Sequence, residues 1–308
     1  MFERWLALDV GAYEVRLHDY GHQSDAKTRT VMAFRHHEPI AYGQDALTYI
    51  YKDPSVQIRY PIQEGDVDHS ISDLIAHCLD VLKSSQTLLK PCIWMAVPSG
   101  SSEEALMRWQ HLLLDAGIKK TKFITNEELL QTKEACFLIH AGHSYTEMGI
   151  FVNGTRRAYK KISFAGSRMD DQIKRVVANK TNCLISNEDA SALKHAASDA
   201  FWKNKNARLV CMAMDRYQRL GQIEISAADL WPALEMIEQQ IVLWAKQCFK
   251  EQPFEMKQAL LKKGIFLDGG LARCFGLRQL LEQAFSCPVI AAEFPEYEII
   301  NTMKELRP

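Results

Sequence analysis

The stretch that decides the fold runs from Phe137 to Ile150 and reads FLIHAGHSYTEMGI. An apolar run, a tight turn and a second apolar run predict a β-hairpin whose strands are buried. A hairpin that binds phosphate has this layout. Its turn, however, contains one glycine, two histidines and a tyrosine. The stretch therefore predicts a hairpin and leaves open whether a nucleotide binds there.

The N-terminal half opens with a comparable pattern. The apolar run Trp5–Asp9 is closed by Gly11 and followed by alternation over Val15–His18, which predicts another strand, turn and strand. Apolar residues at helical spacing follow over 71–82, with Asp68 or Ser70 expected as the cap. A buried strand at 92–97 and a helix with a capping box of Ser101 and Glu104 come next. This order of strands and helices predicts an α/β fold with a covered sheet.

The second half repeats this theme. A hairpin over about 136–152 precedes a helix around 167–179, and Ser226 with Asp229 is expected to cap a long helix that contains Pro232. A strand at 264–268, a Gly269-Gly270 turn and a helix at 275–285 follow. Because each half opens with a glycine-turn hairpin, we expect two lobes, residues 1–133 and 134–308, with a cleft between them.

Composition limits the classes of function. The 308 residues are 47% hydrophobic and 24% charged, as in ordinary globular proteins, and the net charge of −1 argues against nucleic acid as a partner. Eight cysteines form no CxxC pair, which fits a reducing cytosol. The N-terminus is too short for a signal sequence, and no apolar run approaches the ~20 residues of a spanning helix. We expect a cytoplasmic protein with at most peripheral membrane contact.

Several segments, in order, resemble the actin-like ATPase superfamily and, within it, the bacterial MreB family. The resemblance covers nearly the whole chain. The similar segments are LALDVGAYEVRL (6–17), IAYGQDALTYIYKDPSVQIRYPIQEGDV (40–67), WMAVPSG (94–100), ITNEEL (124–129), FLIHAGHSYTEMGI (137–150), ISFAGSRMDDQI (162–173), LISNEDASALK (184–194) and IFLDGGLARCFGLRQLLEQAFSCPVIAAEFP (265–295). It implies a two-lobed actin-like (ribonuclease H-like) fold with a central nucleotide cleft, and ATP with Mg²⁺ as its ligands.

The resemblance also implies which residues meet the nucleotide. The first phosphate hairpin corresponds to Asp9, Gly11, Ala12, Tyr13 and Glu14, with Asp9 orienting the water shell of the metal ion. In the second hairpin the aspartate of the family falls on His140, and its glycine-rich turn on Gly142, His143, Ser144 and Tyr145. These side chains would intrude where glycines let the backbone approach phosphate. Protonated histidines could also contact phosphate, so nucleotide binding stays open beside a plain hairpin.

Hydrolysis requires a group that activates or orients water. The resemblance assigns this role to Glu127 and Glu128, but Leu129 replaces the proline of the family and the connection to His140 is shorter. The alternative is that both glutamates begin a solvated helix. For the adenosine, the resemblance implies Glu188 and Lys194, and a turn of Gly269, Gly270 and Leu271. The alternative is a strand end beside an exposed lysine.

Membrane contact is a further implication. Leu88 and Leu89 match an apolar pair through which MreB proteins are thought to touch lipid, and Phe2 and Trp5 would add to it. Core packing is the alternative for these side chains.

We therefore expect a divergent MreB-like cytoskeletal protein. It would assemble with itself or with a standard MreB into filaments at the membrane, serve cell shape beside cell-wall elongation proteins, and show weak or absent ATP hydrolysis. The alternatives are an active actin-like ATPase whose site tolerates these substitutions, and a non-polymerising binding or chaperone-like module on the same fold.

Overall fold

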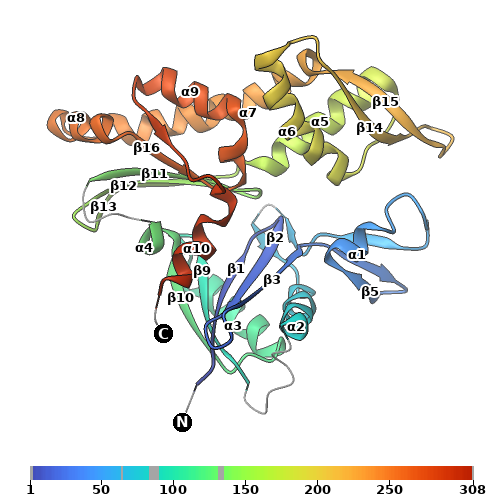
Figure 1. Ribbon diagram of the computed structural model, residues 1–308, viewed down its shortest axis with the longest axis horizontal. Helices are drawn as coiled ribbons and strands as arrows, with labels where there is room; N and C mark the ends of the chain where they lie inside the picture. The colour runs from blue at the N-terminus through green and yellow to red at the C-terminus, as the bar shows by residue number, and fades with distance from the viewer. Residues whose placement is uncertain (1–2, 64, 83–89, 131–134, 307–308) are drawn as a thin grey trace. The chain divides into compact units, whose positions relative to one another are not determined.

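The protein is described by a computed structural model that covers residues 3–63, 65–82, 90–130 and 135–306 (Figure 1). The chain forms two compact units. The first comprises residues up to 130 together with those from 297 onward, and the second comprises residues 131–296. Each unit is described by itself.

The first unit is built on a five-stranded sheet in the order β10-β9-β1-β2-β3. Strands β1 (Trp5–Val10), β2 (Glu14–Asp19) and β3 (Ser24–Arg29) form an antiparallel meander. Strands β9 (Cys92–Val97) and β10 (Lys120–Thr125) continue the sheet in parallel with β1. The predicted strand–turn–strand opening and the strand at 92–97 are confirmed.

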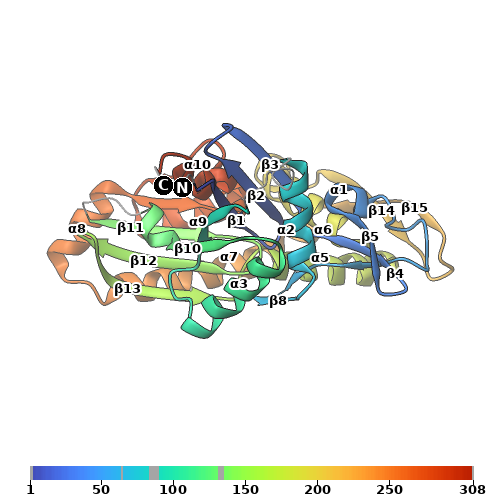
Figure 2. The ribbon, with the colours of Figure 1, turned by 90° about the horizontal axis from the view of Figure 1, so that it is seen from below.

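Alternation along β1 places its side chains on two covered faces. Leu6 and Leu8 are fully buried among residues of α2 (Ile71–Val81) and α3 (Glu103–Asp115). Ala7, on the opposite face, is buried among residues of α4 (Asn126–Leu130) and α10 (Glu298–Lys304). Figure 2 shows α10 and α3 on either side of β1. A central strand buried on both faces explains the unbroken apolar run read from the sequence.

The C-terminal segment differs from expectation, because the expected second lobe ran to residue 308. Here the residues from 297 onward group with the first unit. The reason is a short apolar stripe on α10, in which Ile299, Ile300 and Met303 are at most 4% exposed. The Tyr20 hydroxyl also donates to the carbonyl oxygen of Met303 at 2.6 Å. Local sequence does not specify which element a stripe of this kind packs against.

Two smaller sheets complete the first unit. Strands β4 (Met32–Arg35), β5 (Glu38–Tyr42) and β6 (Gln57–Arg59) form a three-stranded sheet that carries the short helix α1 (Gly43–Leu47). Strands β7 (Ile62–Gln63) and β8 (Asp66–Val67) form a small antiparallel pair.

The second unit repeats the plan of the first. Its sheet has the order β13-β12-β11-β16-β17, in which β11 (Cys136–Ala141), β12 (Thr146–Val152) and β13 (Thr155–Ile162) form the meander. Strands β16 (Ile265–Asp268) and β17 (Val289–Ile290) continue it in parallel. The predicted pseudo-repeat is thus confirmed as two sheets, each with a meander followed by parallel strands. The predicted α/β class is confirmed as well.

Helices cover the second sheet. Residues of α5 (Gly166–Thr181), α6 (Asn187–Lys203), α7 (Ala227–Lys250) and α9 (Phe275–Phe285) share one core with β11 and β12. Helix α8 (Phe254–Lys263) precedes β16. The remaining short helical turns are η2 (Gly270–Arg273) and η3 (Pro295–Tyr297). A two-stranded ribbon, β14 (Arg208–Met214) with β15 (Leu220–Ser226), projects beyond α5 and α6 in Figures 1 and 2.

The helix caps follow the sequence in one case and differ by one residue in another. Ser226 accepts a hydrogen bond from the backbone N–H of Asp229, so it caps α7 as predicted, and Pro232 lies within the helix. The predicted cap Ser101 is wrong, because Ser102 accepts the bond from Ala105 while the Ser101 hydroxyl donates to the Pro98 carbonyl oxygen. Ser70 is the N-cap residue of α2, without a side-chain cap bond.

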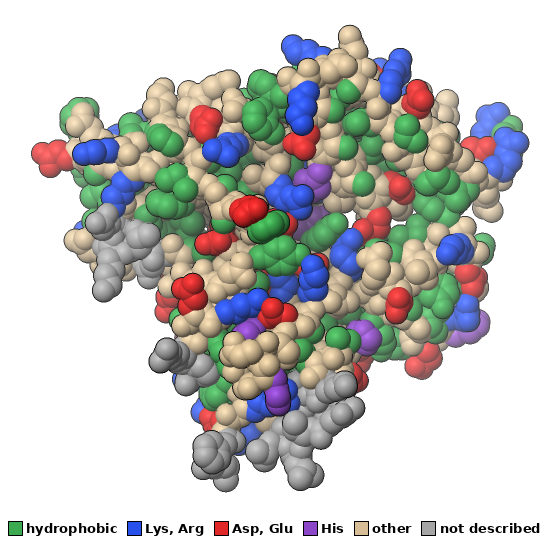
Figure 3. All heavy atoms as spheres, in the orientation of Figure 1, with side chains coloured by type: hydrophobic (Ala, Val, Ile, Leu, Met, Phe, Trp, Pro, Cys, Tyr) green, Lys and Arg blue, Asp and Glu red, His purple; other side chains and the backbone are tan. Residues whose placement is uncertain are grey.

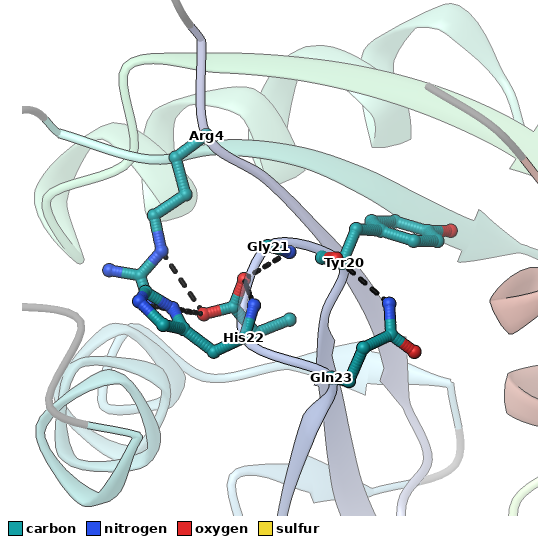
Figure 4. A network of polar contacts seen from close by, with 6 residues as sticks. Arg4, Tyr20, Gly21, His22 and Gln23 are labelled. Atoms are coloured by element: carbon teal, nitrogen blue, oxygen red, sulfur yellow. Dashed lines mark hydrogen bonds and ion pairs between the residues drawn. The ribbon is translucent and has the colours of Figure 1, made fainter.

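One buried carboxylate closes the turn between β2 and β3 (Figure 4). Asp19 is fully buried, and its Oδ2 accepts from Arg4 and lies 2.7 Å from Nδ1 of His22. Its Oδ1 accepts from the backbone N–H of Gly21 at 2.9 Å. Burial alone would raise the pKa of Asp19, but the hydrogen bonds from Arg4, His22 and Gly21 outweigh it and lower the pKa to about 2.

We expect acid to weaken the fold through Asp19. A carboxyl group whose pKa is lowered on folding stabilises the folded state at pH values above its unfolded-state pKa. This stability is lost as the pH falls through the folded-state pKa. From about pH 5 to about pH 2, wild type should therefore lose about 2 kcal/mol more unfolding free energy than Asp19→Asn. Urea unfolding at each pH measures the difference.

Asp80→Asn, on the exposed side of α2, is the matched control and should lose as much as wild type. Equal acid dependence in wild type and Asp19→Asn would contradict this role for Asp19.

Candidate functional site

The first hairpin turn is held by its own backbone. The Gly11 N–H donates to the Glu14 carbonyl oxygen at 3.1 Å, and the Thr30 N–H donates to the Tyr13 carbonyl oxygen at 3.0 Å. A Cβ atom on Gly11 would lie only 2.9 Å from the Glu14 oxygen, so this position accepts only glycine. Ala12 lies partly buried beside the core of the first unit. The turn that the resemblance assigns to phosphate is therefore compact and bonded to itself.

Tyr13 and Arg29 form a stacked pair over this turn. The guanidinium carbon of Arg29 lies 3.5 Å from the centre of the Tyr13 ring, and its Nε donates to the Tyr13 carbonyl oxygen at 3.1 Å. Such a cation–π contact stabilises both side chains at a surface position. A bulky ring and a cation thus stand at the turn that the resemblance assigns to phosphate.

Arg16 joins the two acidic residues of the first hairpin. One of its terminal nitrogens donates to Asp9 Oδ2 at 2.9 Å, and its Nε donates to Glu14 Oε1 at 2.8 Å. All three side chains are 13–15% exposed. Burial alone would lower the pKa of Arg16, but Asp9 and Glu14 raise it above its ordinary value. The carboxylate predicted to orient the metal's water is therefore already paired with a cation.

The second hairpin carries a side-chain hydrogen bond between neighbouring strands. His140 Nδ1 lies 2.8 Å from Asp268 Oδ2, and both side chains are largely buried, at 14% and 6% exposed. The two residues are partners in the parallel register of β11 and β16. His140 occupies the position where the resemblance implies an aspartate, and the carboxylate of Asp268 lies on the adjacent strand.

The turn of this hairpin bonds to the start of α5. The Gly142 N–H donates to the Tyr145 carbonyl oxygen at 3.0 Å, which closes the turn. The Gly166 N–H donates to the Gly142 carbonyl oxygen at 3.1 Å, and the Ser167 N–H to that of His143 at 2.7 Å. The first N–H groups of a helix are a common binding site for anions. Two of these groups are already used by the turn.

Lys194 is buried in the second unit. Its Nζ lies 2.9 Å from Asp170 Oδ1 and donates to the Gly166 carbonyl oxygen at 3.4 Å, and the residue is 2% exposed. His143 Nδ1 lies 3.9 Å from the other oxygen of Asp170. Burial raises the pKa of Asp170 to about 6, although Lys194 opposes the rise. The alternative of an exposed lysine is wrong, and the predicted contact of Lys194 with a nucleotide stays a prediction.

The Gly269-Gly270 turn follows β16 as predicted. Gly269 has φ of 84°, and a Cβ atom there would lie 2.5 Å from the Ala141 carbonyl oxygen, so glycine is required for β16 to pass β11. Gly270 has open space around it. Leu271 is 2% exposed in the core of the second unit, so only its backbone remains for a ligand. Glu188 lies half-buried in the first turn of α6.

Glu128 takes a structural role at the start of α4. Its Oε2 accepts from the backbone N–H of Thr125 at 2.7 Å, and the Glu128 N–H donates to the Thr125 hydroxyl at 3.3 Å. This reciprocal pair is a capping box. The Glu127 N–H donates to the Ser99 hydroxyl at 3.0 Å. The helix is only five residues long, in line with the short connection seen in the sequence.

The predicted membrane contacts fall mostly outside the described residues, which exclude Phe2, Leu88 and Leu89. Trp5 is described, and it packs edge-on against Trp94 with ring centres 6.2 Å apart. Lys120 and Lys122 lie 5.6 and 5.2 Å from its ring. Across residues 3–63, 65–82, 90–130 and 135–306, no helix is both long and apolar enough to cross a membrane.

On the face shown in Figure 3, acidic and basic side chains are interspersed, as the net charge of −1 suggests. No cluster of three or more His, Cys, Asp or Glu side chains that could ligate a metal occurs within the described part of the chain. All eight cysteines are free thiols, and seven of them are buried.

Three charged residues of the candidate site were not identified from the sequence: Arg16, Asp170 and Asp268. Arg16 had a usable signal, because a hairpin turn at Gly11–Glu14 places it directly opposite Asp9. Asp268 ends a strand that is parallel to β11, and such ends meet at one edge of a sheet. Asp170 lies within segment 162–173, which resembles the family, but local sequence does not indicate its partner Lys194 on another helix.

Comparisons with known proteins agree with this fold. The family described as MreB/Mbl protein matches residues 3–307. The cell shape-determining protein Mbl of Bacillus subtilis is 23% identical over 96% of this chain and 93% of its own length, and MreB of Escherichia coli is 22% identical over 96% and 90%.

Solved structures give the same result. MreB5 of Spiroplasma citri bound to AMPPNP has a TM-score of 0.86 at 18% identity, over 99% of this chain and 96% of that one. A MamK double helical filament has a TM-score of 0.78 at 14% identity, over 99% and 100%. At these identities the structures establish an actin-like fold.

We expect Lys194→Met to destabilise the second unit, because it removes the nearest cation from buried Asp170. The unfolding free energy should fall by about 3 kcal/mol, as when one partner of a buried pair is removed. The double variant Asp170→Asn/Lys194→Met should recover part of this loss, since it leaves no uncompensated charge. Chemical denaturation measures both.

Lys180→Met is the control, because Lys180 pairs with Asp229 at the surface; it should cost less than about 1 kcal/mol. Equal losses at positions 180 and 194 would contradict a stabilising buried pair.

Proposed function

The chain belongs to the MreB/Mbl family, and on that premise we propose that it is a divergent cytoskeletal member that assembles into filaments and serves cell shape. The observation that carries this proposal is the family match over residues 3–307, together with the two repeated sheets. Relatives that cover nearly the whole chain are named cell shape-determining proteins, and one similar structure is a double helical filament. The subunits would be copies of this chain, a standard MreB, or both.

We place the protein in the cytoplasm, with filaments lying at the membrane beside cell-wall elongation proteins. Support for the membrane comes from the sequence pair Leu88-Leu89, which matches a lipid-contacting pair of the family. Two leucines contribute a few kcal/mol if buried in lipid, which becomes substantial only when repeated along a filament.

Nucleotide would serve this protein as a ligand with weak or absent turnover. Structures of the similar MreB5 carry AMPPNP and ADP, which supports nucleotide binding by this fold. Against efficient hydrolysis, Glu128 is held in the capping box with Thr125, and the acidic residues of the first hairpin are paired with Arg16. In the second hairpin, His140 stands where the resemblance implies an aspartate.

One observation favours the second candidate, an active ATPase. A histidine whose Nδ1 is bonded to a carboxylate presents its Nε2 as a base, and His140 with Asp268 has that arrangement. Water attacking the terminal phosphate would give its proton to Nε2 and release ADP and phosphate.

Phosphate release from ATP decides between these two candidates. We expect a rate close to that of ATP in buffer alone, and no change in Glu128→Gln, because glutamine preserves the capping box. A rate well above buffer that is lost in His140→Ala would instead establish the ATPase. A rate that is lost in Glu128→Gln but not in His140→Ala would return the role to the residue predicted from the sequence.

We expect filaments in negative-stain electron microscopy, for this chain alone or mixed with a standard MreB. Light scattering should rise above a critical concentration. Particles of single-subunit size under every condition, with and without lipid, would contradict assembly and favour a non-polymerising module on the same fold.

Lipid contact needs its own control. Filaments should pellet with anionic vesicles, and Leu88→Ser/Leu89→Ser should assemble as well as wild type but remain in the supernatant. Equal pelleting of both proteins would contradict contact through this pair.

A further inference from the structure

We infer that this chain binds its nucleotide without a divalent metal ion, with the Arg16 guanidinium compensating the carboxylates of the first hairpin that would otherwise repel the phosphates. This inference rests on the nucleotide binding proposed above. It concerns one carboxylate, Asp9, to which the resemblance gives the task of orienting a metal's water shell. The structure gives that carboxylate a different partner.

Asp9 and Arg16 are held together by the backbone. They are directly opposite in the antiparallel register of β1 and β2, with Arg16 donating to Asp9 Oδ2 at 2.9 Å. Pairs of opposite charge at such positions stabilise a hairpin. The pair is therefore built into the sheet and does not depend on a flexible loop.

Arg16 is also fixed from its other sides. Its Nε donates to Glu14 at 2.8 Å, and its guanidinium carbon lies 4.7 Å from the centre of the Tyr297 ring. The Tyr297 hydroxyl in turn accepts from Lys27 Nζ at 2.9 Å. With a carboxylate on two sides and an aromatic ring on a third, the guanidinium has little freedom to leave Asp9.

The charges of this cluster already balance. Asp9 and Glu14 carry two negative charges, and Arg16 and Lys27 carry two positive ones. The hydrogen bond to Tyr297 and the charge of Glu14 raise the pKa of Lys27, which keeps it protonated. A divalent ion needs carboxylates with charge to spare. Here it would find a neutral cluster and a guanidinium at hydrogen-bond distance from the oxygen it requires, so these residues do not fit a hydrated metal ion.

The second hairpin points the same way, considered by itself. His140 stands at the position of the aligned aspartate, and the nearest carboxylate, Asp268, lies 2.8 Å from its ring. This carboxylate too is engaged with a basic side chain.

The first experiment needs no variant. Wild-type protein is titrated with ADP by isothermal calorimetry, once with excess MgCl₂ and once with excess EDTA. We expect the same affinity in both buffers. Binding that requires magnesium would overturn this inference while leaving nucleotide binding intact. Absence of binding in both buffers would overturn this inference and the proposed nucleotide ligand together.

The second experiment removes the positive charge of Arg16. In Arg16→Gln the Asp9 carboxylate loses its cation, so ADP affinity in EDTA should fall by about tenfold or more, and magnesium should restore part of it. Arg35→Gln removes a guanidinium that pairs with Asp53 at the surface, and should bind like wild type in both buffers.

Each outcome of the variant test is informative. An Arg16→Gln protein that binds ADP as wild type does in EDTA would overturn the role of Arg16. If this variant does not fold, as judged by its thermal melting curve, the comparison of magnesium with EDTA on wild type still decides the inference.

Discussion

The structure depends on one arrangement that occurs in both units: a central strand with an antiparallel partner on one side and a parallel neighbour on the other. In the first unit this strand is β1 between β2 and β9, and in the second it is β11 between β12 and β16. The arrangement brings a hairpin turn and the carboxyl end of a neighbouring strand to the same edge of the sheet. Every residue considered for the nucleotide phosphates lies at such an edge or on the helix that follows it.

At these edges, side-chain chemistry differs from what the fold requires. The backbone demands glycine at Gly11 and Gly269, where any Cβ would meet a carbonyl oxygen within 3 Å. The strands and helices beside these turns carry basic side chains paired with carboxylates: Arg16 with Asp9, His140 with Asp268, and buried Lys194 with Asp170. Each pair is complete within its own unit. The charges at both edges are thus compensated by the protein itself.

Much of the fold was predictable from the sequence, and much of the site was not. The hairpins, the strand at 92–97 and the capped helix at Ser226 follow from periodicity and local caps, which act over a few residues. The packing of α10 onto β1 joins residues nearly 300 positions apart, and no local pattern encodes it. For the same reason the burial of Lys194 could not be predicted, because it depends on α5 and α6 lying together. The pairing of Arg16 with Asp9 could have been predicted, because hairpin register follows from the turn.

A cation attached to the chain and a cation from solution are different solutions to one electrostatic problem. A metal ion must be captured from solution and loses translational freedom each time it binds. A guanidinium fixed opposite Asp9 by strand pairing has lost that freedom already on folding, and it cannot dissociate. It also cannot adjust its coordination as charge moves during phosphoryl transfer, as a metal ion with mobile waters does. The exchange therefore favours holding a nucleotide over cleaving it, which suits the proposed role as a filament subunit.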